Sequence, residues 1–112
     1  MPDIEITLTF SGGNVSYRIG NESKIGLNLT ETEYNLLLGL AELSGNDWIL
    51  PYDDAYKIVY YGEENLSNGR CPDNLAKVIS RTRKELHPYG EQIIVTVHTR
   101  GLKRGFKPEF ID

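Results

Sequence analysis

The stretch that decides the fold is residues 73–86, DNLAKVISRTRKEL, followed by residues 93–110, IIVTVHTRGLKRGFKPEF. In the first segment, uncharged side chains recur at the spacing of one face of an α-helix: Leu75, Ile79, Thr82 and Leu86. Polar and cationic side chains follow the opposite face and its borders: Lys77, Ser80, Arg81, Arg83 and Lys84. The segment is therefore predicted to be a helix with one buried face and one cationic face.

The second segment is predicted to be a β-hairpin. Residues 93–98 alternate as one strand, and residues 105–110 are predicted to return as its partner. Cations gather around the glycine-bounded tip at residues 101–105: Arg100, Lys103, Arg104 and Lys107. A cationic helix followed directly by a cationic hairpin favours a surface for the phosphate backbone of a nucleic acid.

The net charge argues against a nucleic-acid partner, whereas the charge distribution argues for one. The 112 residues carry a net charge of -4. Residues 1–66 hold three cations against eleven acids, whereas residues 67–112 hold nine cations against five acids. A nucleic-acid footprint is a local property of one surface, so the basic second half supports the interpretation. The alternative, that these charges only solvate the surface, stays open.

Length and composition indicate one domain with its own core. Cys71 is the only cysteine, which excludes an internal disulfide framework. No apolar run reaches the roughly 20 residues that span a bilayer. The N-terminus lacks the basic start and the apolar block of a signal peptide. A cytoplasmic protein is therefore expected.

No catalytic, cofactor or metal site is expected. The paired acids are sequence neighbours, so their side chains need not converge as a catalytic pair must: Asp53, Asp54, Glu63 and Glu64. His87 and His98 have no third ligand at metal-binding spacing. No glycine-rich phosphate loop occurs. The sequence favours a binding protein over an enzyme.

The segments before residue 73 predict strands and then helices. Alternating residues at 4–10 and 15–19, with a third segment at 25–29, predict a small antiparallel sheet. Thr30-Glu-Thr-Glu33 has the form of a capping box, and the helix it starts is predicted to end near residues 44–46. These features place a sheet before the helical core.

Residues 51–61 are predicted to form the second helix, because Pro51 suits a first turn. Its predicted core face consists of Ala55, Ile58 and Val59. Trp48 is interpreted as a core residue between the first two helices, and Asn74 as a cap of the third. The fold class is therefore predicted to be α+β, a winged helix-turn-helix. One domain over residues 1–112 would comprise the sheet (1–29), a three-helix core (30–86) and a wing hairpin (93–110).

Three motifs in order give the chain a family resemblance. They are Leu29-Thr30-x-x-Glu33-Tyr34-x-Leu36-Leu37-x-x-Leu40, then Ile79-Ser80-Arg81-Thr82-Arg83-Lys84-x-Leu86, then Thr96-Val97 with Gly105-Phe106. The chain resembles the effector domain of OmpR/PhoB-type bacterial response regulators over almost its whole length. That family's pattern runs L-T-x-x-E-x-x-L-L-x-x-L, I-S-x-L-R-x-K-L and T-V-R-G-x-G-Y. Thr82 stands where the family usually has Leu, the wing is longer, and the 112 residues leave no room for the family's receiver domain.

The resemblance implies a sequence-specific DNA-binding transcription regulator, bacterial or phage-encoded, with double-stranded DNA as its partner and a dimer on DNA as an option. The third helix would read the major groove, and the wing would contact the DNA backbone. The residues expected at the DNA are Lys77, Ser80, Arg81, Arg83, Lys84, Arg100, Lys103 and Arg104.

A second hypothesis from another class is a winged helix re-purposed for protein interaction, acting on transcription or other host machinery. The acidic first half favours it. In the resembled family the loop between helices two and three contacts RNA polymerase. Here RNA polymerase or another protein would meet an acidic, tyrosine-rich surface that includes Tyr52, Tyr56, Glu63 and Glu64.

Overall fold

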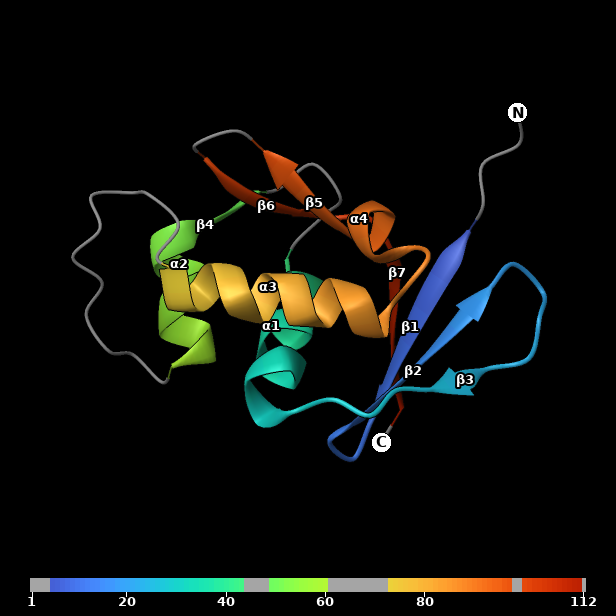
Figure 1. Ribbon diagram of the computed structural model, residues 1–112. Helices are drawn as coiled ribbons and strands as arrows, with labels where there is room; N and C mark the ends of the chain where they lie inside the picture. Colours follow the sequence, from blue (N-terminus) through green and yellow to red (C-terminus); the bar gives the residue numbers. More distant parts are fainter. Residues whose placement is uncertain (1–4, 44–48, 61–72, 98–99, 112) are drawn as a thin grey trace.

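The computed structural model describes residues 5–43, 49–60, 73–97 and 100–111 (Figure 1). The first half contains strands β1 (Ile6–Ser11), β2 (Asn14–Ile19) and β3 (Ile25–Gly26), helix α1 (Glu31–Ala41), strand β4 (Ile49–Pro51) and helix α2 (Tyr52–Val59). The second half contains helices α3 (Asp73–Glu85) and α4 (Gly90–Ile93) and strands β5 (Ile94–Val97), β6 (Gly101–Arg104) and β7 (Lys107–Ile111).

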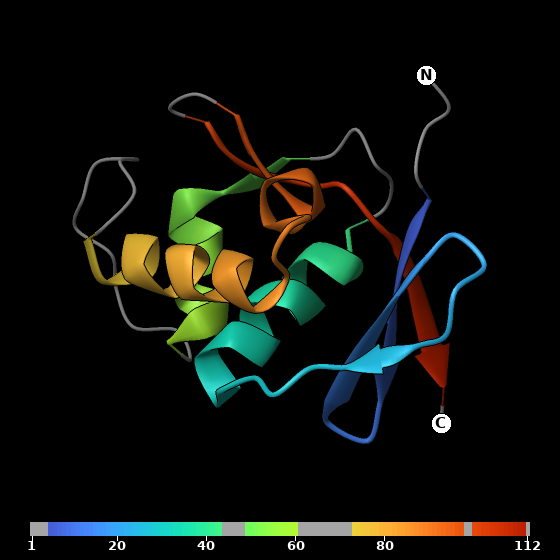
Figure 2. The same cartoon turned by 45° about the vertical axis from the view of Figure 1, so that its right-hand side comes forward.

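A four-stranded sheet in the order β3-β2-β1-β7 stands beside the helices (Figure 2). The antiparallel pairing predicted for the first three strands is confirmed. Ile6, Leu8 and Phe10 are buried, as their alternation predicted. β7 runs parallel to β1, so the end of the chain completes a sheet that its beginning started.

The predicted partner strand of the wing hairpin is wrong. β5 pairs with β6, which is residues 101–104, and β4 adds a third strand on the other side of β6. Residues 107–111 leave the hairpin and pair with β1 instead. Gly105 lies where the chain departs: its N–H donates to the Ile93 carbonyl over 2.9 Å, and a side chain there would overlap the Gln92 carbonyl. Phe110 then stacks on Phe10 with ring centroids 5.4 Å apart.

Helix α1 begins with the predicted capping box. The Thr30 N–H donates to Glu33 Oε1 over 2.8 Å, and the Glu33 N–H donates to Thr30 Oγ1 over 3.4 Å. Both exchanges satisfy N–H groups that the first helical turn leaves without a helical acceptor. The helix packs on the core through three fully buried side chains, Leu36, Leu37 and Leu40. The predicted helix end near residues 44–46 lies outside the described residues, and α1 as described ends at Ala41.

Helix α2 is shorter than predicted at its start, where Pro51 belongs to β4, and it ends at Val59 with Tyr60 as its C-cap. Residue 61, the predicted end, lies outside the described residues. Ala55 and Val59 are buried, as predicted, but Ile58 is 37% exposed. Tyr52 takes the third buried position of this helix and is 7% exposed. The residues 49–51 before the helix pair with β6. Trp48 lies outside the described residues.

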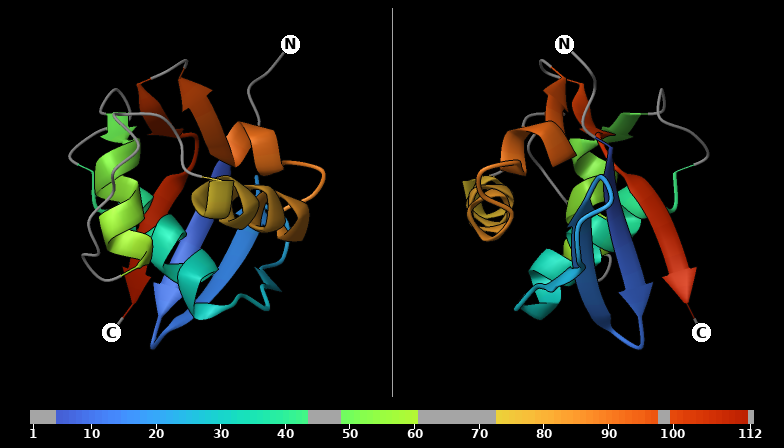
Figure 3. Two further views of the ribbon diagram at one scale, coloured as in Figure 1. Left: turned by 60° about the vertical axis from the view of Figure 1, so that its left-hand side comes forward. Right: turned by 90° about the vertical axis from the view of Figure 1, so that its right-hand side faces the viewer.

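Helix α3 forms the outer layer of the helical part. Figure 3 shows it end-on at one side of the molecule, with the wing strands β5 and β6 above it. It packs on α1 and α4. All four residues of its predicted core face are buried, namely Leu75, Ile79, Thr82 and Leu86, and Val78 joins them. None of the helices in the described parts of the chain is long and apolar enough to cross a membrane.

Candidate nucleic-acid interface

The side of α3 opposite the core carries a run of exposed polar and cationic side chains. We call this set the cationic face: Lys77, Ser80, Arg81 and Lys84, all exposed. In sequence, no acid lies between Asp73 at the start of α3 and Glu85 at its end. The prediction that Lys77, Arg81 and Lys84 face the solvent is therefore confirmed.

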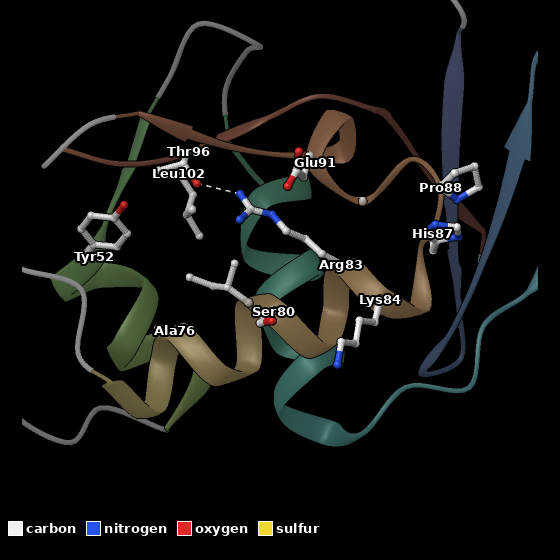
Figure 4. A pocket seen from close by; sticks show the side chains of 12 residues that line it. Tyr52, Ala76, Ser80, Arg83, Lys84, His87, Pro88, Glu91, Thr96 and Leu102 are labelled. Atoms are coloured by element: carbon white, nitrogen blue, oxygen red, sulfur yellow. Dashed lines mark hydrogen bonds between the residues drawn. The ribbon is translucent and has the colours of Figure 1, made fainter.

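A groove of about 610 Å³ separates α3 from the β5–β6 hairpin, which is called the wing below (Figure 4). Its α3 wall includes Ser80, Arg83 and Lys84, and Thr96 and Leu102 line it from the wing. His87 and Glu91 also line it, so Glu91 is the one acidic residue in the lining. The helix and the wing therefore frame a concave surface whose lining holds two cations, Arg83 and Lys84, and one acid.

Arg83 lies in this groove, but its guanidinium is held by the wing. Nη2 donates to the Ile94 carbonyl over 2.6 Å and to Thr96 Oγ1 over 2.7 Å, and Nε donates to the same carbonyl over 3.2 Å. The side chain is half-buried. The sequence placed Arg83 beside the cationic face, whereas the structure turns it toward β5.

Arg104 does not lie on the wing surface, which corrects its prediction as a DNA contact. It is 8% exposed, and Nη1 donates to the carbonyls of Leu40, Ala41 and Leu43 over 3.3, 2.8 and 3.1 Å. These carbonyls lie at and just beyond the C-terminal end of α1, where the last turn lacks helical donors and attracts cations. Arg104 therefore joins β6 to α1 and is not a residue of the interface.

The remaining predicted wing cations divide between the hairpin and the sheet. Arg100 is exposed beside the hairpin turn, where its N–H donates to the Val97 carbonyl over 3.1 Å. Lys103 is half-buried on β6. Lys107 lies on β7 opposite Thr7, so it belongs to the N-terminal sheet and not to the hairpin tip.

A polar cluster links α2 to the start of α3 through hydrogen bonds that helical spacing alone did not indicate. The rings of Tyr56 and Tyr60 lie 4.8 Å apart, the Tyr60 hydroxyl donates to the Asn74 carbonyl over 3.3 Å, and Asn74 Nδ2 donates to the Tyr56 hydroxyl over 3.4 Å. Asn74, predicted to be a cap, lies inside the first turn of α3, and its Oδ1 accepts from the Leu75 N–H. Burial raises the pKa of Tyr60 above 10.0, Tyr56 adds to the rise, and Arg81 opposes it.

The predicted protein-binding surface is not brought together in the described residues. Tyr52 is buried, and Tyr56 is half-buried within the cluster just described. Glu63 and Glu64 lie outside the described residues. In the described parts of the chain, no three His, Cys, Asp or Glu side chains gather as metal ligands do. His98 and Cys71 are outside those parts.

The chain matches no protein-family model and no curated protein. It is similar in structure to the DNA-binding domain of the response regulator AdeR, solved in complex with an intercistronic region. The TM-score is 0.61 and the sequence identity 22%, over 82% of this chain and 85% of that one. This chain therefore has the winged helix-turn-helix fold of the OmpR/PhoB-type response-regulator DNA-binding domain.

Proposed function

We propose that this chain is a sequence-specific DNA-binding regulator of transcription that inserts α3 into the major groove and rests its wing on the backbone. The observation that carries the proposal is the cationic face, an exposed and acid-free run on the outermost helix, beside a groove lined in part by Arg83 and Lys84. The structural similarity to a response-regulator domain solved with an intercistronic region supports it. As a bacterial or phage regulator on chromosomal DNA, it acts in the cytoplasm.

The residues of the cationic face suit different parts of a duplex. Arg81 carries a planar guanidinium that can donate two parallel hydrogen bonds to one guanine in the major groove. Lys77 and Lys84 flank it by one helical turn on each side, where the phosphates at the groove edges lie. Ser80 supplies a hydroxyl for either a base or a phosphate.

Arg100 and Lys103 are the wing residues that the proposal retains. Phosphate contacts fix the position of a protein on the duplex and carry no base information. The wing would therefore determine which base pair Arg81 contacts. Two chains on adjacent half-sites would place their reading helices about 34–36 Å apart, one turn of the duplex.

The protein-interaction alternative is favoured by the acidic first half of the sequence, but the described residues do not form the surface that it needs. One of its two described tyrosines is buried, and the other is occupied in the Tyr56–Tyr60–Asn74 cluster. DNA binding is the function that the geometry supports best.

The test is selection of bound duplexes from a pool with a randomised centre, followed by titration of the enriched duplex at several salt concentrations. The proposal expects one enriched motif and an affinity that falls steeply between about 50 and 200 mM salt. Absence of binding at about 50 mM salt would contradict the proposal, and binding without any enriched motif would contradict sequence-specific reading.

A further inference from the structure

The side chain of Arg83 spans the groove between α3 and the wing and links the two. Arg83 extends from the C-terminal half of α3 to β5, where it donates hydrogen bonds to the Ile94 carbonyl and to the Thr96 hydroxyl. Figure 4 shows the bond to Thr96. The shorter two of its three hydrogen bonds, 2.6 and 2.7 Å, come from the same nitrogen, Nη2. Charge-assisted bonds of this length are the strong class of protein hydrogen bonds.

Both ends of this link are fixed. At the helix end, Gly90 of α4 packs so closely on the Arg83 backbone that a Cβ there would overlap the Arg83 carbonyl and Cα. At the wing end, Ile94 is fully buried and is paired with Arg104 across the β5–β6 ladder. A rigid planar group between two fixed backbones holds one separation, which a flexible ammonium on a carbon chain would not.

From this geometry we infer that Arg83 is the positioning residue that sets the separation between α3 and the wing, so that both engage the duplex together. The inference rests on the proposed function and assigns Arg83 a role in it other than phosphate contact. Because Arg83 would act through the wing and not on a phosphate, it would release no counterion from DNA. Its loss should weaken binding without lowering the salt dependence.

Thr96 gives a way to weaken the link by one hydrogen bond without changing any charge. It is an exposed residue of β5, so Thr96→Val removes the acceptor and leaves the core untouched. Thr96→Ser keeps the hydroxyl and serves as the matched control. Lys84→Gln provides the second control, since it removes the same charge as Arg83→Gln from the neighbouring position.

The experiment measures DNA affinity against salt for these four variants and for the Arg83→Gln/Thr96→Val double variant, each checked for folding by its thermal transition. We expect Thr96→Val to bind about 3-fold more weakly and Arg83→Gln about 10-fold, both with an unchanged log–log salt slope. Thr96→Ser should bind like the original chain. The double variant should bind like Arg83→Gln alone, because the hydrogen bond between residues 83 and 96 is already absent in Arg83→Gln. Lys84→Gln should lower the slope by about 1.

Three results would overturn the inference while leaving the proposed function intact. The first is a salt slope that falls for Arg83→Gln as it does for Lys84→Gln, which would make Arg83 a phosphate contact. The second is additive losses in the double variant, which would make Thr96 an independent DNA contact. The third is unchanged binding by Thr96→Val. No DNA binding by the original chain would overturn the proposed function itself, and this inference with it.

Discussion

Arg104 on β6 donates from Nη1 to the carbonyl of Ala41, the last residue of α1, over 2.8 Å. A cation of the basic second half thereby stabilises a helix of the acidic first half. The same nitrogen also reaches the carbonyls of Leu40 and Leu43. Arg104 therefore stabilises the fold, and its substitution should lower the free energy of unfolding.

Arg104→Gln should lower the free energy of unfolding by about 1.5–3 kcal/mol, the range for hydrogen bonds to a charged group. The carbonyls at the end of α1 would lose their cation in a buried setting. Urea denaturation measures the change. Arg100→Gln is the matched control, since Arg100 is exposed and should alter stability by less than about 0.5 kcal/mol. Equal stability of the two variants would contradict the assigned role of Arg104.

Glu109 on β7 should titrate below its ordinary range. The hydrogen bond from Lys24 Nζ, 3.3 Å long, is the largest cause that lowers the pKa of this carboxyl from 4.5, and the one from Thr9 Oγ1, 3.1 Å long, is the next. Because the pKa is lower in the folded chain than in the unfolded one, its stabilising effect is present above the unfolded value. That effect is lost as the pH falls through the folded value.

NMR titration of the Glu109 carboxyl measures this pKa directly. Lys24→Gln should move it back toward its ordinary value, because the main partner of the ionised form is removed. Lys57→Gln, on α2, is the control and should leave it in place. A pKa that stays where it was in Lys24→Gln would show that the ion pair with Lys24 does not hold the carboxylate.

Arg81→Ala should relax the choice of one base pair. If Arg81 binds a guanine through two hydrogen bonds, its removal costs about 1–3 kcal/mol on the preferred duplex. It should cost much less on a duplex in which that pair is replaced. Competition between the two duplexes gives the ratio. The same loss on both duplexes would show that Arg81 contacts the backbone and not a base.

Arg100→Gln combined with Lys103→Gln should weaken binding to every duplex by the same factor. Contacts from the wing to phosphates carry no base information, and the salt slope should fall by about 1 for each cation lost. Affinities for the selected duplex and for an unrelated duplex of equal length give the comparison. A loss confined to the selected duplex would place the wing on bases.

Local patterns in the sequence were enough to predict the elements that depend on neighbouring residues. The two faces of α3 follow from spacing alone, and so does the capping box of Thr30 and Glu33, because each is contained within a few helical turns. The exposed positions Lys77 and Lys84 were therefore placed correctly.

Pairing between distant strands could not be predicted in the same way. Alternation shows that a segment is a strand, but it does not show which strand lies beside it. The pairing of β7 with β1 joins the two ends of the chain, and it moved Lys107 off the wing. Two glycines do mark the limits of the short strand β6: Gly101 is its first residue and Gly105 follows its last. Gly101 has φ +152° and approaches the Leu50 carbonyl too closely for any side chain.

The roles of Arg83 and Arg104 also depend on tertiary contacts. In the sequence both are cations directly beside a lysine, Lys84 or Lys103, and nothing in the local pattern tells the arginine from the lysine. Arg104 is buried because the carbonyls at the end of α1 accept its hydrogen bonds. Arg83 is held because the Ile94 carbonyl of β5 accepts from it. Arginine lends itself to such buried roles because its fork binds several carbonyl or hydroxyl oxygens at once.

The measurement that tests the central claim most directly compares two double variants with the same change in charge. Lys77→Gln/Lys84→Gln removes the two exposed lysines of the cationic face, and Lys24→Gln/Lys57→Gln removes two exposed lysines of the first half. Affinity for the selected duplex is titrated against salt near 0.15 M, where the Debye length is about 8 Å and distant charges are screened. The account predicts that the first variant lowers the salt slope by about 2 and that the second leaves the slope and the affinity unchanged. Equal losses in both variants would contradict the assignment of α3 as the DNA-reading helix.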